Sequence, residues 1–274
     1  MGEYKLQYKS RLSKQQVKDK ICAHAMFGNH GISPRPNSTR QVQEYFITRG
    51  INTDDLIEEL RDPQKPIPVF ENLIRSTWIA NVSGGGSVSL VDEDGNVETE
   101  IKKPGLFIWS SYEAHFEAAC DARDRAVKSS SYEAFLECLS QGFASIEAFF
   151  NAKSKFWNKK HPEDLLFDSK NQKVNLEEKI EQWLPKMSGG IQMDKSGQVW
   201  NEFKNLKKIR DDIAMHPKLA GQGITYDDFT KQINQFRLGI AQILANLHYI
   251  LQIPVPSVII NGIYTPDVEV INDP

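Results

Sequence analysis

LKKIRDDIAMHPK, residues 206–218, has the spacing of an amphipathic helix that stops at a proline. With 100° per residue, the apolar residues of this helix gather on one side, which carries Phe203, Leu206, Ile209 and Ile213. Arg210 lies about 20° from Phe203 on this wheel, inside the apolar face. An arginine on a buried face is destabilising unless it is paired, hydrogen-bonded or directed at an anion. The pattern therefore predicts a packed helix face that holds one cation with a specific partner.

A histidine ends the same helix. His216 lies about 20° from Ile209 on the wheel, at the flank of the apolar face. Because Pro217 disfavours helical geometry at the residue before it, His216 is expected at the helix C-terminus, where the macrodipole favours a protonated imidazole. An arginine that binds phosphate and a histidine that carries protons suit the cleavage of RNA by its own 2′-OH.

The neighbouring sequence predicts a helical bundle over residues 109–252. Two apolar stripes at helical spacing precede the arginine helix: Trp109, Tyr112, Phe116, Ala119 and Ala126, and then Tyr132, Phe135, Leu136, Leu139, Phe143, Ile146 and Phe150. A short helix over residues 175–187 and a long one over residues 226–251 complete the bundle. These lengths are sufficient to bury a continuous core.

The flanking regions mix strands with helices, so the expected fold class is α+β. Residues 1–108 form a small α/β N-terminal region with three short helices, the last over residues 52–61. VSLVDEDGNVETEI (residues 88–101) predicts a β-hairpin, part of an antiparallel sheet, around an Asp-Gly turn. Residues 253–274 are proline-spaced and β-branched, which predicts an extended C-terminal arm that folds back.

Composition and motifs argue against several function classes. The net charge of −3 is not that of a uniformly basic nucleic-acid surface, although a local basic patch remains compatible with it. The three cysteines, Cys22, Cys120 and Cys138, are widely spaced, and His24 and His30 have no third ligand nearby, so neither a metal nor another cofactor is expected. A polar N-terminus and the lack of a long apolar run predict a cytoplasmic protein without membrane spans.

The arginine helix resembles the motif helix of HEPN domains. RDDIAMH (residues 210–216) fits the R-x(4–6)-H pattern of that family, with a polar residue directly after the arginine. An aromatic-rich lead-in (VWNEFKNLKKI), the proline after the histidine and a long closing helix fit as well. SQGFASIEAFFNAKS (residues 140–154) is similar to the early HEPN helix that packs on the motif helix. The resemblance covers roughly residues 112–251, and the additional helix between residues 159 and 197 departs from it.

The resemblance implies a metal-independent endoribonuclease that works as a homodimer, as in toxin–antitoxin and antiviral-defence systems. Arg210 and His216 would be catalytic, and Asp211 would orient or tune them. Glu147, which the resemblance does not include, is a further candidate because its carboxylate could pair with Arg210 from the early helix. The partners would be RNA as substrate, a second copy of the chain, and an antitoxin or regulatory protein.

A basic-aromatic segment is the expected RNA contact. KSKFWNKK (residues 153–160) places Lys153, Lys155, Lys159 and Lys160 around Trp157, although a solvated helix end has the same composition. Two alternatives to the nuclease stay open. One is a catalytically silent HEPN-type binding and dimerisation module, and the other is a sensor whose N-terminal region recognises a ligand and controls the helical domain.

Overall fold

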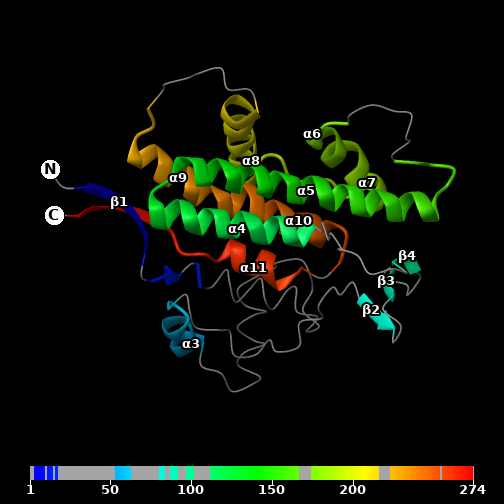
Figure 1. Cartoon of the computed structure of the whole chain (residues 1–274), viewed down its shortest axis with the longest axis horizontal. Helices are drawn as coiled ribbons and strands as arrows, with labels where there is room; N and C mark the ends of the chain where they lie inside the picture. The colour runs from blue at the N-terminus through cyan, green and yellow to red at the C-terminus, as the bar shows by residue number, and fades with distance from the viewer. Residues whose placement is uncertain are drawn as a thin grey trace.

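The computed structural model describes residues 3–9, 11–14, 16–17, 53–62, 80–83, 87–91, 97–101, 112–166, 174–215, 223–253 and 255–273. The described chain is mostly helical and carries two small antiparallel sheets, which confirms the α+β class (Figure 1). Its helices are α3 (Thr53–Glu59), α4 (Tyr112–Ser129), α5 (Tyr132–Lys160), α6 (Leu176–Glu178), η1 (Lys179–Trp183), α7 (Leu184–Met187), α8 (Gln198–Ile209), η2 (Arg210–Met215), α9 (Tyr226–Phe236), η3 (Arg237–Gln242), α10 (Ile243–Ile250) and α11 (Ser257–Ile263).

Helices α4 and α5 form a long antiparallel hairpin at the centre of the molecule (Figure 1). Ser131 caps α5, since its hydroxyl accepts a hydrogen bond from the Ala134 amide at 3.2 Å. Ser130 reverses the chain with a φ of 50°. From the predicted stripes, Phe116, Phe135 and Phe143 are fully buried, and their rings contact Phe236, Phe229 and Phe203 of the neighbouring helices.

The segments η1, η2 and η3 are π-helical, with hydrogen bonds from residue i to i+5, and each continues an α-helix. The predicted helix over residues 175–187 is confirmed as α6, η1 and α7, and it begins at Asn175 with a capping box closed by Glu178. The predicted final helix is confirmed as α9, η3 and α10. All of its expected core residues are buried: Phe229, Ile233, Phe236, Ile240, Ile243, Leu244 and Leu247.

The two ends of the chain meet in a two-stranded sheet. Strand β1 (Glu3–Tyr8) pairs antiparallel with β5 (Val268–Asp273), so the termini lie side by side in Figure 1. Both outer edges are capped by side chains. The Leu6 amide donates to Ser130 Oγ at 3.0 Å, and the Asn234 amide exchanges two hydrogen bonds, 2.8 and 3.0 Å long, with the Val268 backbone. Side chains therefore complete hydrogen bonds that a neighbouring strand would otherwise provide.

A buried arginine joins this sheet to the helices. Arg123 of α4 is 1% exposed and donates to the Tyr8 hydroxyl at 3.1 Å and to the Pro266 carbonyl at 3.3 Å. The Tyr8 hydroxyl donates in turn to Asp124. Strand β1 therefore packs with the helical part of the chain, although the sequence predicted its residues in a separate region ending at residue 108.

The second sheet lies at the opposite end of the molecule in Figure 1. Strands β2 (Ala80–Ser83), β3 (Ser87–Val91) and β4 (Val97–Ile101) are antiparallel in that order. The predicted hairpin of β3 and β4 is confirmed, and β2 adds a third strand. The predicted helix over residues 52–61 is confirmed as α3, while the two helices predicted before it lie largely outside the described residues.

The expected extended C-terminal arm is only partly correct. Its last residues form β5, but its middle forms α11, whose Ile259 and Ile260 are fully buried. Gly262 lets this helix approach α4, because a Cβ at that position would lie 2.4 Å from the Phe116 ring. Burial against α4 therefore outweighs the low helix propensity of a β-branched sequence.

Candidate functional site

Arg210 stands at the point where the arginine helix changes from α to π geometry. Helix α8 ends at Ile209, and η2 runs from Arg210 to Met215. Because i→i+5 bonding adds a residue to each turn, an α-helical wheel no longer places side chains correctly beyond Ile209. The expectation that Ile213 belongs to the packed face is accordingly wrong, since this side chain is 40% exposed.

The Arg210 side chain is held from two directions. Its guanidinium carbon lies 4.4 Å from the centre of the Phe143 ring on α5, within the range of a cation–π contact. Its Nε and Nη2 both donate to Asp211 Oδ1, at 2.9 and 2.6 Å. The side chain is 19% exposed. Among the described residues Nη1 has no hydrogen-bond acceptor.

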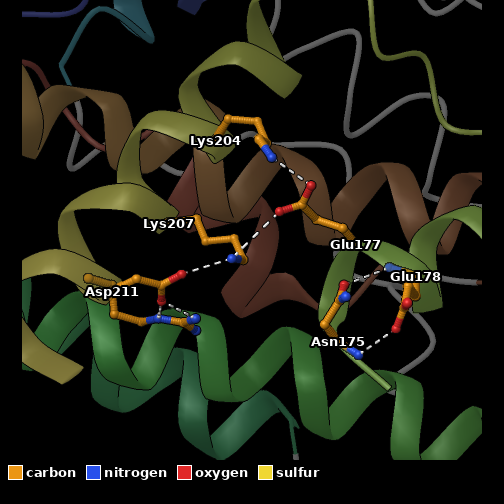
Figure 2. A network of polar contacts seen from close by, with 7 residues as sticks. Asn175, Glu177, Glu178, Lys204, Lys207 and Asp211 are labelled. Atoms are coloured by element: carbon orange, nitrogen blue, oxygen red, sulfur yellow. Dashed lines mark hydrogen bonds and ion pairs between the residues drawn. The ribbon is translucent and has the colours of Figure 1, made fainter. Parts of the chain in front are cut away.

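Asp211 connects Arg210 to a row of charged side chains, which Figure 2 shows. Its second oxygen, Oδ2, accepts from Lys207 Nζ at 2.8 Å. Lys207 also lies 3.5 Å from Glu177 of α6, and Glu177 accepts from Lys204 at 2.6 Å. We call Arg210, Asp211, Lys207, Glu177 and Lys204 the charged row. It ties α6 to the arginine helix through alternating charges.

The charged row keeps its two carboxylates ionised. Burial acts to raise the pKa of Asp211, but hydrogen bonds from Lys207 and Arg210 outweigh it and hold this pKa below its usual value. Glu177 behaves in the same way, since the hydrogen bond and charge of Lys204 outweigh the effect of burial and lower its pKa. Asp211 therefore meets Arg210 as an anion at neutral pH.

Glu147 does not pair with Arg210, contrary to the sequence-based expectation. It lies one turn beyond Phe143 on α5, and its carboxylate accepts a hydrogen bond from Lys179 of η1. Lys179 also donates to Asn151 Oδ1 at 3.2 Å, and its side chain is only 9% exposed. A buried lysine takes the nearest carboxylate because an unpaired ammonium would be strongly destabilising there. Glu147 thus anchors η1 to α5, and the carboxylate beside Arg210 is that of Asp211 instead.

His216 and Pro217 lie outside the described residues, which reach Met215 in η2. The expected pairing of an arginine and a histidine on one face is therefore described only for its arginine half. That half combines a flat guanidinium, an aromatic support and an adjacent carboxylate. Such a group binds an anion through the N–H groups that its protein partners leave available.

The basic-aromatic segment lies at the far end of α5. Lys155, Lys159 and Lys160 are exposed there, and Lys153 is half-buried with its Nζ 5.9 Å from the Phe149 ring centre. Trp157 is half-buried, and its Nε1 donates to the Asp164 carbonyl at 2.9 Å. The five expected RNA contacts therefore share one end of α5, but helical spacing places Lys155 and Lys159 on the opposite side of the helix from Trp157.

Sequence reasoning missed the partners of the arginine. Lys207 and Asp211 are four residues apart on a helix, which is the spacing of an ion pair and a signal that could have indicated this contact. No sequence signal indicated Glu177, which reaches the row from another helix. Among the described residues no group of three or more His, Cys, Asp or Glu is suited to hold a metal ion, and no described helix has the length and apolar character needed to cross a membrane.

Comparisons with protein-family models, with curated proteins and with solved structures find no match for this chain. The interpretation of the site rests on its own residues and on the resemblance of residues 210–216 to the HEPN motif.

Proposed function

We propose that the chain is a metal-independent endoribonuclease of HEPN type. The observation that carries the proposal is the support of Arg210, whose guanidinium lies on Phe143 and against Asp211, while Nη1 has no hydrogen-bond acceptor among the described residues. A guanidinium oriented in advance stabilises the charge of a phosphorane without reorganising during the reaction. The helical surroundings and the R-x(4–6)-H spacing of residues 210–216 support the same assignment.

In the proposed reaction the substrate provides its own nucleophile. The imidazole of His216 takes the proton of a ribose 2′-OH, and the 2′ oxygen attacks the neighbouring phosphorus. The bond from phosphorus to the 5′ oxygen breaks, and that oxygen leaves with a proton from an imidazolium. The products are a 2′,3′-cyclic phosphate and a 5′-hydroxyl. Arg210 meets the negative charge of the intermediate, and Asp211 holds the guanidinium in position.

The proposal includes a homodimer, because one arginine and one histidine make a sparse active site. A second protomer would bring its own pair into one cleft, so that His216 of the partner subunit donates the proton to the leaving oxygen. Light scattering should find a dimer at micromolar concentration. An antitoxin or a regulatory protein would act on this assembly, with the N-terminal region as a sensor.

One observation favours the alternative of a catalytically silent binding module. Asp211 already accepts from two of the Arg210 nitrogens, so the cation is largely neutralised without any substrate. An arginine of this kind can serve packing alone. The two functions differ in what happens to RNA, which makes the test direct.

The test is cleavage of single-stranded RNA by the purified protein in EDTA. The parent should leave 2′,3′-cyclic phosphate ends and should not cut DNA, which lacks the 2′-OH. His216→Ala should lower the rate about 10²- to 10⁴-fold. Arg210→Ala should lower it about 10²- to 10³-fold. Lys208→Ala, which removes an exposed cation from the same helix, should cut like the parent.

Circular dichroism should establish that all variants are folded, since Arg210 contacts the core. Folded Arg210→Ala and His216→Ala proteins that cut RNA at the parental rate would refute the mechanism. If the parent cuts no RNA alone or with candidate partners, the binding module becomes the better assignment.

A further inference from the structure

Two aromatic rings are stacked at the C-terminal end of α5. The ring of His161, the residue that ends the helix, lies 3.9 Å from the centre of the Trp157 ring with an angle of 24° between the planes. The His161 amide donates to the Trp157 carbonyl at 2.8 Å, and the Trp157 indole is bonded to the Asp164 carbonyl. The stack is therefore fixed by the backbone at both of its members.

The stack is accessible, and lysines are exposed at the same end of the helix. The His161 side chain is 41% exposed although one of its ring faces lies on Trp157. Lys155 and Lys160 are exposed on the same helix end, and Lys160 Nζ lies 4.1 Å from the Phe156 ring centre.

Acidic groups lie nearby as well. Asp164 is neutralised by Lys186 at 2.6 Å, and Glu163 lies 3.8 Å from His161 Nδ1. Near the stack, Lys186 and Lys160 thus match the two acids in number. Exposed rings with neighbouring lysines are the combination that binds single-stranded nucleic acid, since bases stack on rings and phosphates meet cations.

We propose that the exposed face of His161 stacks a base of single-stranded RNA while Lys160, its neighbour in the chain, meets an adjoining phosphate. The proposal deepens the ribonuclease function and rests on it, because it assigns a second contact of the same substrate. His161 lies 18 residues beyond Phe143, which is about 27 Å along α5 and on the same side of the helix. At a stacked spacing of about 3.4 Å, this distance corresponds to roughly eight nucleotides between the stack and Arg210.

The test measures binding without cleavage. A fluorescent oligonucleotide of 2′-O-methyl RNA cannot undergo attack by a 2′-OH, and its anisotropy reports binding to the full chain. His161→Ala should raise Kd about 5- to 150-fold, the effect of losing one base–aromatic stack. His161→Phe keeps a ring and should bind like the parent. Tyr226→Ala, which removes another exposed ring at the start of α9, should leave Kd unchanged.

The outcomes separate the two proposals. If the parent does not bind the oligonucleotide, or if His161→Ala binds as tightly as the parent, the stacking site is refuted. Cleavage of ordinary RNA by the parent would then still support the nuclease. If His161→Ala binds weakly while no RNA is ever cut, the stacking site stands and the nuclease falls. Equal losses for His161→Phe and His161→Ala would also refute stacking, because the ring would then be irrelevant.

Discussion

Replacing Gly239 with alanine should move the arginine helix. Gly239 lies in η3 where this segment crosses α8, and a Cβ there would lie 2.8 Å from the carbonyl carbon of Glu202 and 2.9 Å from its oxygen. The same Cβ would lie 2.8 Å from Leu206 Cδ1. The leucine can rotate, but the Glu202 backbone cannot yield unless α8 and η3 separate.

The expected loss of stability follows from two opposing effects. Alanine gains about 1 kcal/mol over glycine inside a helix. Overpacking costs about 1 to 3 kcal/mol, and contact with backbone favours the upper end. The net effect of Gly239→Ala is therefore a loss of about 1 to 2 kcal/mol in the free energy of unfolding. Because α8 leads directly into η2, which begins at Arg210, the proposed RNA cleavage should slow as well.

Urea unfolding followed by circular dichroism measures this loss, and two other glycines provide matched controls. Gly142→Ala meets only side chains, the nearest being Ile240 Cγ2 at 3.0 Å, so its effect should be smaller. A Cβ at Gly223 would have no described atom within 4 Å, and Gly223→Ala should be neutral. A Gly239→Ala protein as stable as Gly223→Ala would contradict the inferred close approach of α8 and η3.

Four further substitutions probe other contacts. Since its pKa is lowered, the Asp211 carboxylate stabilises the fold at neutral pH and loses this effect as pH falls below about 4. Asp211→Asn should thus lower the free energy of unfolding by about 0.5 to 1 kcal/mol at pH 7 and by less in acid, which urea titration at both pH values measures. Glu147→Ala leaves the buried Lys179 ammonium without its carboxylate and should lower the free energy of unfolding by about 2 to 3 kcal/mol. Lys179→Met leaves a carboxylate that reaches water and should lower it by under about 1 kcal/mol, so equal losses for the two variants would contradict the argument. Ser130→Ala should cost about 1 kcal/mol and speed hydrogen exchange of the Leu6 amide, and unchanged exchange would show that the hydroxyl does not protect it.

The helical elements were predictable because their apolar residues repeat at the period of an α-helix. Phe229, Ile233 and Phe236 illustrate this, since each is buried as its spacing predicts. The prediction that Ile213 is packed was wrong because π geometry changes the angle between successive side chains. Periodicity alone does not reveal where a helix changes from α to π geometry. Helix α11 was not predicted because its stability comes from contact with α4 rather than from its own helix propensity.

The site was predictable in its residue types and less so in its pairings. Sequence spacing placed Arg210 on a packed face, and the resemblance to the HEPN motif implied that Asp211 orients it; the structure brings both together with Phe143. The choice between Glu147 and Asp211 as the arginine's partner depended on where Lys179 lies. That lysine comes from a different helix, so its position is a property of the tertiary packing and not of any local pattern.

The arrangement around Arg210 answers why the helix carries a cation in its packed face. The Phe143 ring covers one face of the guanidinium, which stays favourable because a ring face attracts a cation while its hydrocarbon fills the core. Asp211 occupies one edge, and its ionised state is maintained by Lys207. A fork-to-fork pair would engage this one edge with both carboxylate oxygens. Here both donors reach a single oxygen, because Lys207 takes the other one. Among the described residues no acceptor bonds to Nη1 at the other edge, and a phosphate has the geometry to bind there.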